Sequence, residues 1–127
     1  MAWCFEDESS PYADVILDRL DTEEAIVPNL FPLELANVLL VGERRKRLTE
    51  ADTVRFLRLL GDLRITIDTE TSLRALKETL SVARENNLSE YDAVYLELAM
   101  REGLPLATFD EPLKKAASKV GVSIAKM

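Results

Sequence analysis

The chain of 127 residues contains no histidine and a single cysteine, Cys4. Without histidine it has no imidazole base and no zinc-finger pattern, and one cysteine cannot form an internal disulfide. Catalysis would therefore have to use carboxylates, hydroxyls, lysine or arginine. The length fits one domain, residues 1–127, which is large enough to bury a hydrophobic core.

Long apolar runs and an excess of positive charge are also missing. No stretch approaches the length of a membrane span, and no basic and apolar signal segment opens the chain, so we expect a cytoplasmic protein. The 16 lysines and arginines against 23 acidic residues give a net charge of −7, which argues against general affinity for nucleic acid. This balance does not exclude a local basic patch.

Short apolar stretches alternate with helical patterns along the chain. Strands are predicted at residues 25–28, 65–68, 104–108 and 122–126, and residues 1–5 have the composition of the far end of another strand or of the turn after it. Helices are predicted at residues 11–21, 31–47, 48–60, 71–86, 89–102 and 112–120. This alternation predicts a three-layer α/β/α sandwich around a mainly parallel sheet whose first strand is truncated.

Apolar positions at helical spacing predict which helix faces are buried. At residues 48–60 these positions are Val54, Leu57 and Leu60. At residues 71–86 they are Leu73, Leu76, Leu80 and Ala83. The helix at residues 89–102 is predicted to be mostly buried, and the side chains left for solvent are Glu97, Arg101 and Glu102.

Two carboxylates, Asp92 and Asp110, lie at the ends of buried elements. Asp92 is three positions after Ser89 in a capping pattern, and Asp110 lies between the strand at residues 104–108 and the helix opened by Pro112. Taken singly, each has an ordinary structural explanation. Asp92 would accept hydrogen bonds from the first N–H groups of its helix, and Asp110 would be an N-cap. Ligands of α/β sheets, however, gather at the carboxyl ends of strands.

Glu34 is a lone charge near the start of the apolar helix at residues 31–47, on one stripe with Asn37. An unpaired carboxylate in such surroundings costs several kcal/mol to desolvate. The helix dipole is one explanation for it, and a metal ion is the other. If the sheet brings Glu34, Asp92 and Asp110 together, three oxygen donors favour Mg²⁺ or Mn²⁺, which activates water. Asn37 would support them.

The same helix ends in a basic cluster at residues 44–47, with the sequence RRKR. Cations at a helix C-terminus complement the macrodipole, which explains the cluster without any ligand. Arg44 and Arg45 also fall near the stripe of Glu34 and Asn37. There they would contact the phosphate backbone of an RNA that passes the acidic site.

Four sequence blocks occur in a characteristic order: AWCFEDE near the start, VPNLFPLELANVLL around Glu34, LSEYDAVYLELA around Asp92 and LPLATFDEPL around Asp110. Together they resemble the PIN domain and, within that family, the VapC toxin ribonucleases of toxin–antitoxin modules. The resemblance implies that Glu34, Asp92 and Asp110 are the metal-binding catalytic acids of a single-strand RNA endonuclease, with Thr108 as a polar supporter. It also implies a homodimer and a cognate antitoxin whose basic segment reaches the acids.

One family feature has no counterpart in the chain. The first strand of the family carries an Asp a few residues before the AWCFEDE-like turn, and that segment would precede Met1. Asp7 lies after the turn, so we do not expect it to replace that Asp. Two functions therefore stay open, a ribonuclease toxin that uses the three acids and a catalytically inactive PIN-fold module that binds other proteins.

Overall fold

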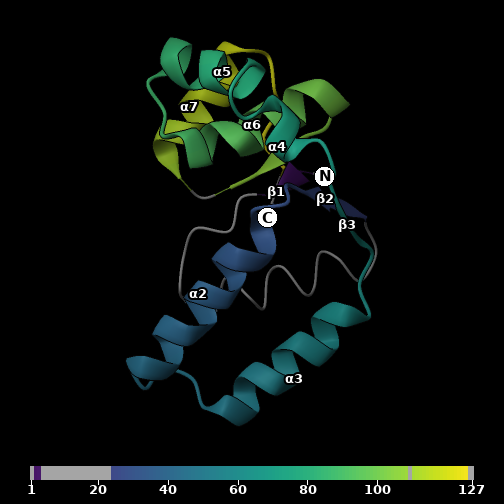
Figure 1. Cartoon of the computed structure of the whole chain (residues 1–127), viewed down its shortest axis with the longest axis vertical. Helices are drawn as coiled ribbons and strands as arrows, with labels where there is room; N and C mark the ends of the chain where they lie inside the picture. The colour runs from purple at the N-terminus through teal and green to yellow at the C-terminus, as the bar shows by residue number, and fades with distance from the viewer. Residues whose placement is uncertain (1, 4–23, 109, 126–127) are drawn as a thin grey trace.

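A parallel sheet of four strands in the order β3-β2-β1-β4 lies between two groups of helices (Figure 1). Its strands are β1 Ala2–Trp3, β2 Ala25–Val27, β3 Ile65–Ile67 and β4 Leu106–Ala107. The computed structural model describes residues 2–3, 24–108 and 110–125. The helix predicted at residues 11–21, like Cys4 and Asp7, lies outside these ranges.

Strand β1 occupies the middle of the sheet. Ala2 is in register with Ile26 of β2 on one side and with Leu106 of β4 on the other, and every pairing is parallel. Beyond β4, the strand predicted at residues 122–126 is reduced within the described residues to a single bridge from Leu106 to Ile124. Because the strands are parallel, the loops that follow β2 and β4 leave the sheet at the same edge.

The helices cover both faces of the sheet. Figure 1 places α4, α5, α6 and α7 on one side of it and α2 and α3 on the other. Their bounds are α2 Phe31–Arg44, α3 Glu50–Gly61, α4 Thr71–Arg74, α5 Glu78–Asn86, α6 Glu90–Glu102 and α7 Glu111–Lys119. The two residues of β4 point to opposite faces of the sheet. Leu106 packs in the hydrophobic core under α6, and Ala107 packs in the core under α2. The predicted three-layer α/β/α arrangement with a parallel sheet is thus confirmed.

Local capping signals set several helix ends where the sequence predicted them. Thr49 and Asp52 form a reciprocal capping box at the start of α3, with both hydrogen bonds at 3.0 Å. The Ser89 hydroxyl accepts the Asp92 N–H at 3.1 Å at the start of α6. Gly103 ends α6 at φ +64°, a left-handed conformation that glycine adopts without steric cost.

The prediction of a single helix at residues 71–86 is wrong. Helix α4 ends at Arg74, and the chain turns at residues 75–77 before α5 begins at Glu78. The apolar spacing runs through this turn, yet Leu73 and Leu76 are exposed, the latter by 84%. Periodicity could not reveal the break, because the two leucines kept the helical spacing without having a core to fill.

Two predictions of burial are also wrong. Helix α3 has no buried residue, and Val54, on its predicted inner face, is 56% exposed. Conversely, Glu97 was predicted to face water and is only 6% exposed, because Arg101 and Arg74 pair with it inside the protein. Among the helices that the structure describes, none combines the length and the apolar character required to cross a bilayer.

Candidate functional site between α2 and α6

Glu34 lies in the first turn of α2, where the chain has just left β2. Pro32 favours helix initiation there, and the Glu34 N–H bonds the Leu30 carbonyl oxygen at 3.1 Å. The Glu34 side chain is half-buried, and its Oε1 atom accepts a hydrogen bond from the Tyr95 hydroxyl of α6. The two helices thus meet through a carboxylate and a phenol, although they cover opposite faces of the sheet.

Asp92 is close enough to Glu34 to change its protonation. Burial raises the pKa of Glu34 above its ordinary value, the hydrogen bond from Tyr95 opposes this rise, and the negative charge of Asp92 adds to it. Asp92 itself is half-buried in the first turn of α6. The structure therefore brings two of the three predicted acids together, one from each helical layer.

Asp110 begins α7, and Thr108 lies just before it. The Asp110 carboxylate accepts the Leu113 N–H at 2.9 Å, which confirms the structural explanation of Asp110 as an N-cap. The Asp110 N–H in turn donates to the hydroxyl of the buried Thr108 at 3.0 Å. Thr108 thereby fixes the backbone of Asp110 at the edge of the sheet that also leads to Glu34.

The three predicted acids do not form one compact group. Within residues 2–3, 24–108 and 110–125, no set of three or more acidic or thiol side chains is arranged to hold a metal ion. Glu34 and Asp92 nevertheless supply the hard oxygen donors that Mg²⁺ and Mn²⁺ prefer. A cation between them would offset both causes that raise the pKa of Glu34, its burial and the negative charge of Asp92, so the donor chemistry fits such an ion.

The other predicted residues of α2 lie further along the helix. Asn37, Arg44 and Arg45 are exposed. The helix ends at Arg44, three residues earlier than predicted, because the N–H of Arg45 closes the last turn and Lys46 adopts φ +60°. At 1.5 Å per residue, Arg44 is about 15 Å from Glu34 along the helix axis.

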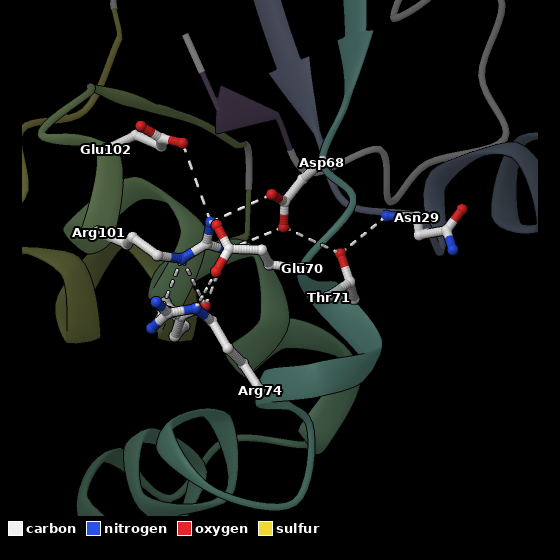
Figure 2. A network of polar contacts seen from close by, with 8 residues as sticks. Asn29, Asp68, Glu70, Thr71, Arg74, Arg101 and Glu102 are labelled. Carbon is white, nitrogen blue, oxygen red and sulfur yellow. Dashed lines mark hydrogen bonds and ion pairs between the residues drawn. The ribbon is translucent and has the colours of Figure 1, made fainter.

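A buried ion network that the sequence did not predict ties α6 to the end of β3 (Figure 2). Arg101 donates from Nη1 and Nη2 to the two carboxylate oxygens of Asp68, at 3.1 and 2.8 Å. Its Nε atom donates to Glu97 at 3.1 Å. Hydrogen bonds from Arg101 hold the pKa of Asp68 below its ordinary value, although burial opposes this shift. Arg74 links Glu97 to Glu70 at the rim.

The network continues to the loop that precedes α2. The Thr71 hydroxyl donates to Asp68 at 3.2 Å and accepts the N–H of Asn29 at 3.0 Å (Figure 2). Asn29 lies between β2 and α2, so this chain of contacts ties the loop before Glu34 to the layer that carries Asp92. The spacing of Glu97 and Arg101 could have suggested an i, i+4 pair, but no local pattern points to Asp68.

Tyr95 is the second residue that sequence reasoning missed. The helical spacing assigned it to the apolar face of its helix, and its ring is indeed 1% exposed. A signal was present, because a buried tyrosine hydroxyl nearly always has a hydrogen-bond partner. The sequence alone could not identify that partner as Glu34, which is 61 positions away.

Comparisons with known proteins agree with this architecture. The chain is similar to the crystal structure of PAE2754 from Pyrobaculum aerophilum, with 27% identity and a TM-score of 0.61 over 84% of this chain and 75% of that one. No curated protein matches the chain in sequence. The family model described as PIN domain matches residues 1–119. The chain therefore belongs to the PIN domain family.

Proposed function

We propose that the chain is a Mg²⁺- or Mn²⁺-dependent endonuclease of single-stranded RNA, the toxin of a cytoplasmic VapC-like toxin–antitoxin pair. PIN domains are generally nucleases and typically use divalent metals. The observation that carries the proposal is the contact between α2 and α6 at Glu34 and Asp92: the Tyr95 hydroxyl of α6 donates a hydrogen bond to Glu34 of α2, and Asp92 lies three positions before Tyr95. Mg²⁺ is commonly held by one or two carboxylates together with substrate phosphates, so these two acids suit such a cation.

In this proposal Glu34, Asp92 and Asp110 bind the metal. When bound, the ion supplies an activated water and positive charge for the scissile phosphate. The hydroxyl of Thr108 keeps Asp110 in place by accepting the backbone N–H of Asp110. Asn37 supports the site from the next turn of α2. The chain has no histidine, so no imidazole takes part in proton transfer.

Arg44 and Arg45, at the C-terminal end of α2, are proposed as contacts for the RNA backbone to one side of the cleaved bond. Their position on α2, about 15 Å from Glu34, suits a strand that lies along the helix. Because the chain carries a net charge of −7, binding would depend on this local patch rather than on the overall field. We therefore expect RNA affinity to fall as salt rises.

A cognate antitoxin is proposed to bind in the apolar groove between α2 and α3. The groove has a volume of about 390 Å³ and is lined by residues that include Phe31, Leu35, Leu57 and Leu60. Glu34 lies on the same helix, so an amphipathic segment with a lysine or arginine could bury its apolar side and reach the acid. A homodimer is proposed as well, and analytical ultracentrifugation at micromolar concentration tests it.

The second candidate function is a catalytically inactive PIN-fold module that binds proteins. Two observations favour it: the described residues contain no group of three acids arranged to hold a metal, and Asp110 is engaged as an N-cap. In this alternative Glu34 and Asp92 only stabilise the first turns of their helices. The exposed apolar side chains of α2 and α3 would then be the functional surface.

Cleavage of a single-stranded RNA with added Mn²⁺ separates the two functions. We expect cleavage by the parent that stops with EDTA and is abolished by Asp92→Asn, while the variant keeps its fold by circular dichroism. Asp62→Asn, at the exposed C-terminal end of α3, is the matched control and should cleave like the parent. Full activity of Asp92→Asn would refute the nuclease proposal, and a parent that neither binds Mn²⁺ nor cleaves RNA would favour the binding module.

A further inference from the structure

The hydroxyl of Tyr95 contacts the candidate metal site, although the ring of Tyr95 lies in the hydrophobic core. The Tyr95 side chain is 1% exposed and belongs to the hydrophobic cluster between the sheet and α5 to α7. Its only polar atom donates a hydrogen bond to Oε1 of Glu34. Asp92 precedes Tyr95 by three positions on α6, so both lie on one side of that helix. One helix thus offers an acid and a hydroxyl to the same glutamate.

The burial of the ring makes Tyr95 a fixed donor. A packed aromatic side chain has two side-chain dihedrals, and both are held when the ring is enclosed. Glu34, by contrast, has three side-chain dihedrals and is only half-buried. A hydrogen bond to a carboxylate is also stronger than one between neutral groups. The contact therefore restricts the glutamate far more than the tyrosine.

We propose that Tyr95 is a positioning residue, which holds Oε1 of Glu34 so that the carboxylate presents Oε2 to the metal beside Asp92. The inference rests on the proposed function, because it assigns Tyr95 a part in the same metal site. Hydrogen bonds of this kind orient metal ligands in many proteins, and their loss typically lowers metal affinity or activity about 10- to 100-fold. Tyr95 itself does not touch the metal or the RNA.

A purely structural role for Tyr95 makes a different prediction. If the hydroxyl only satisfied its own need for a partner, its removal would change stability and leave the metal affinity as it was. The exposed Tyr91, one turn earlier on α6 and 64% exposed, offers a matched control for loss of a phenol hydroxyl. Leu98→Val, in the buried part of the same helix, controls for loosening of the core.

The test is Mn²⁺ titration by calorimetry of the full chain and the variants Tyr95→Phe, Tyr91→Phe and Leu98→Val. We expect Tyr95→Phe to weaken Mn²⁺ binding by about 10- to 100-fold and the two controls to bind like the parent. Should Tyr95→Phe be too unstable to titrate, the Mn²⁺-induced rise in its melting temperature, compared with that of the parent, reports the same affinity change.

The outcomes separate this inference from the function on which it rests. Parent-like Mn²⁺ affinity in Tyr95→Phe, with the parent binding Mn²⁺ and cleaving RNA, would overturn the positioning role alone. An equal loss in Leu98→Val would also overturn it, because general loosening of α6 would then explain the effect. A parent that binds no Mn²⁺ would overturn both proposals.

Discussion

The two helical layers of this PIN domain differ in how completely they are packed. On one side of the sheet, residues 93–99 of α6 are all buried, and α5 and α7 pack around them. On the other side, α3 has no buried residue, and α2 buries one face while Leu33 and Leu40 on its other faces are exposed. Among the described residues, the layer of α6 therefore buries more side chains than the layer of α2 and α3. The candidate site takes one acid from each.

Removal of Arg101 should have the largest effect on stability. Arg101→Ala would leave the buried carboxylate of Asp68 without its cation and Glu97 with Arg74 alone, and breaking a buried pair costs about 3–5 kcal/mol. Arg58→Ala on the exposed surface of α3 is the control, expected to change the free energy of unfolding by less than about 0.5 kcal/mol. Urea unfolding measures both. Similar losses would mean that the buried network adds nothing to the packed layer.

Truncation of one leucine in each layer sharpens the comparison. Leu98→Ala removes a buried side chain of α6 and should lower the free energy of unfolding by about 2–5 kcal/mol. Leu59→Ala truncates a side chain of α3 that is 47% exposed, so we expect about 1 kcal/mol or less. The same urea assay applies. A cost for Leu59→Ala as large as that for Leu98→Ala would show that α3 is packed after all, for example in a dimer.

Loss of a helix cap should act locally in the open layer and globally in the packed one. Thr49→Ala and Ser89→Ala each remove an N-cap and should cost about 1 kcal/mol. Amide hydrogen exchange distinguishes them, because α3 can open by itself whereas α6 exchanges through global unfolding. In Thr49→Ala we expect faster exchange in α3 and unchanged exchange in α6. Faster exchange throughout the protein would contradict this.

The smallest effect is expected in acid. Arg101 lowers the pKa of Asp68 in the folded state, so the stabilisation is present above the unfolded pKa of about 3.9 and is lost as pH falls through the lower folded pKa. The difference in free energy of unfolding between the parent and Asp68→Asn should therefore shrink below about pH 4. Urea midpoints at pH 7, 4 and 3 test this, and a constant difference would contradict it.

Signals that act within a few residues predicted much of the fold. Ser89 and Asp110 were identified as candidate helix caps because a cap needs only its own turn, and the alternation of elements predicted the parallel sheet and its layers. Glu34, Asp92 and Asp110 were predicted to converge; among the described residues the charge of Asp92 acts on Glu34, and no group of three acids is arranged to hold a metal. Burial on α3 was not predictable, because apolar spacing marks a face without showing what, if anything, covers it.

The polar contacts between distant segments could not be predicted for another reason. Arg101 pairs with Asp68 across 33 positions and Tyr95 with Glu34 across 61, and neither pair has a spacing that a helix or a strand would produce. Single charged or phenolic residues in an apolar helix indicate only that some partner is required. The identity of that partner follows from the way the layers pack.

The central position of β1 has a consequence for the synthesis of the protein. Ala2 lies between Ile26, which follows soon after it in the chain, and Leu106, which is synthesised much later. At roughly 5–20 residues per second, β1 waits on the order of ten seconds on the ribosome before its second neighbour exists. Contacts so remote in sequence also slow folding itself, because a long loop must close before they form. A nascent chain therefore cannot complete its sheet until the residues of β4 have been synthesised.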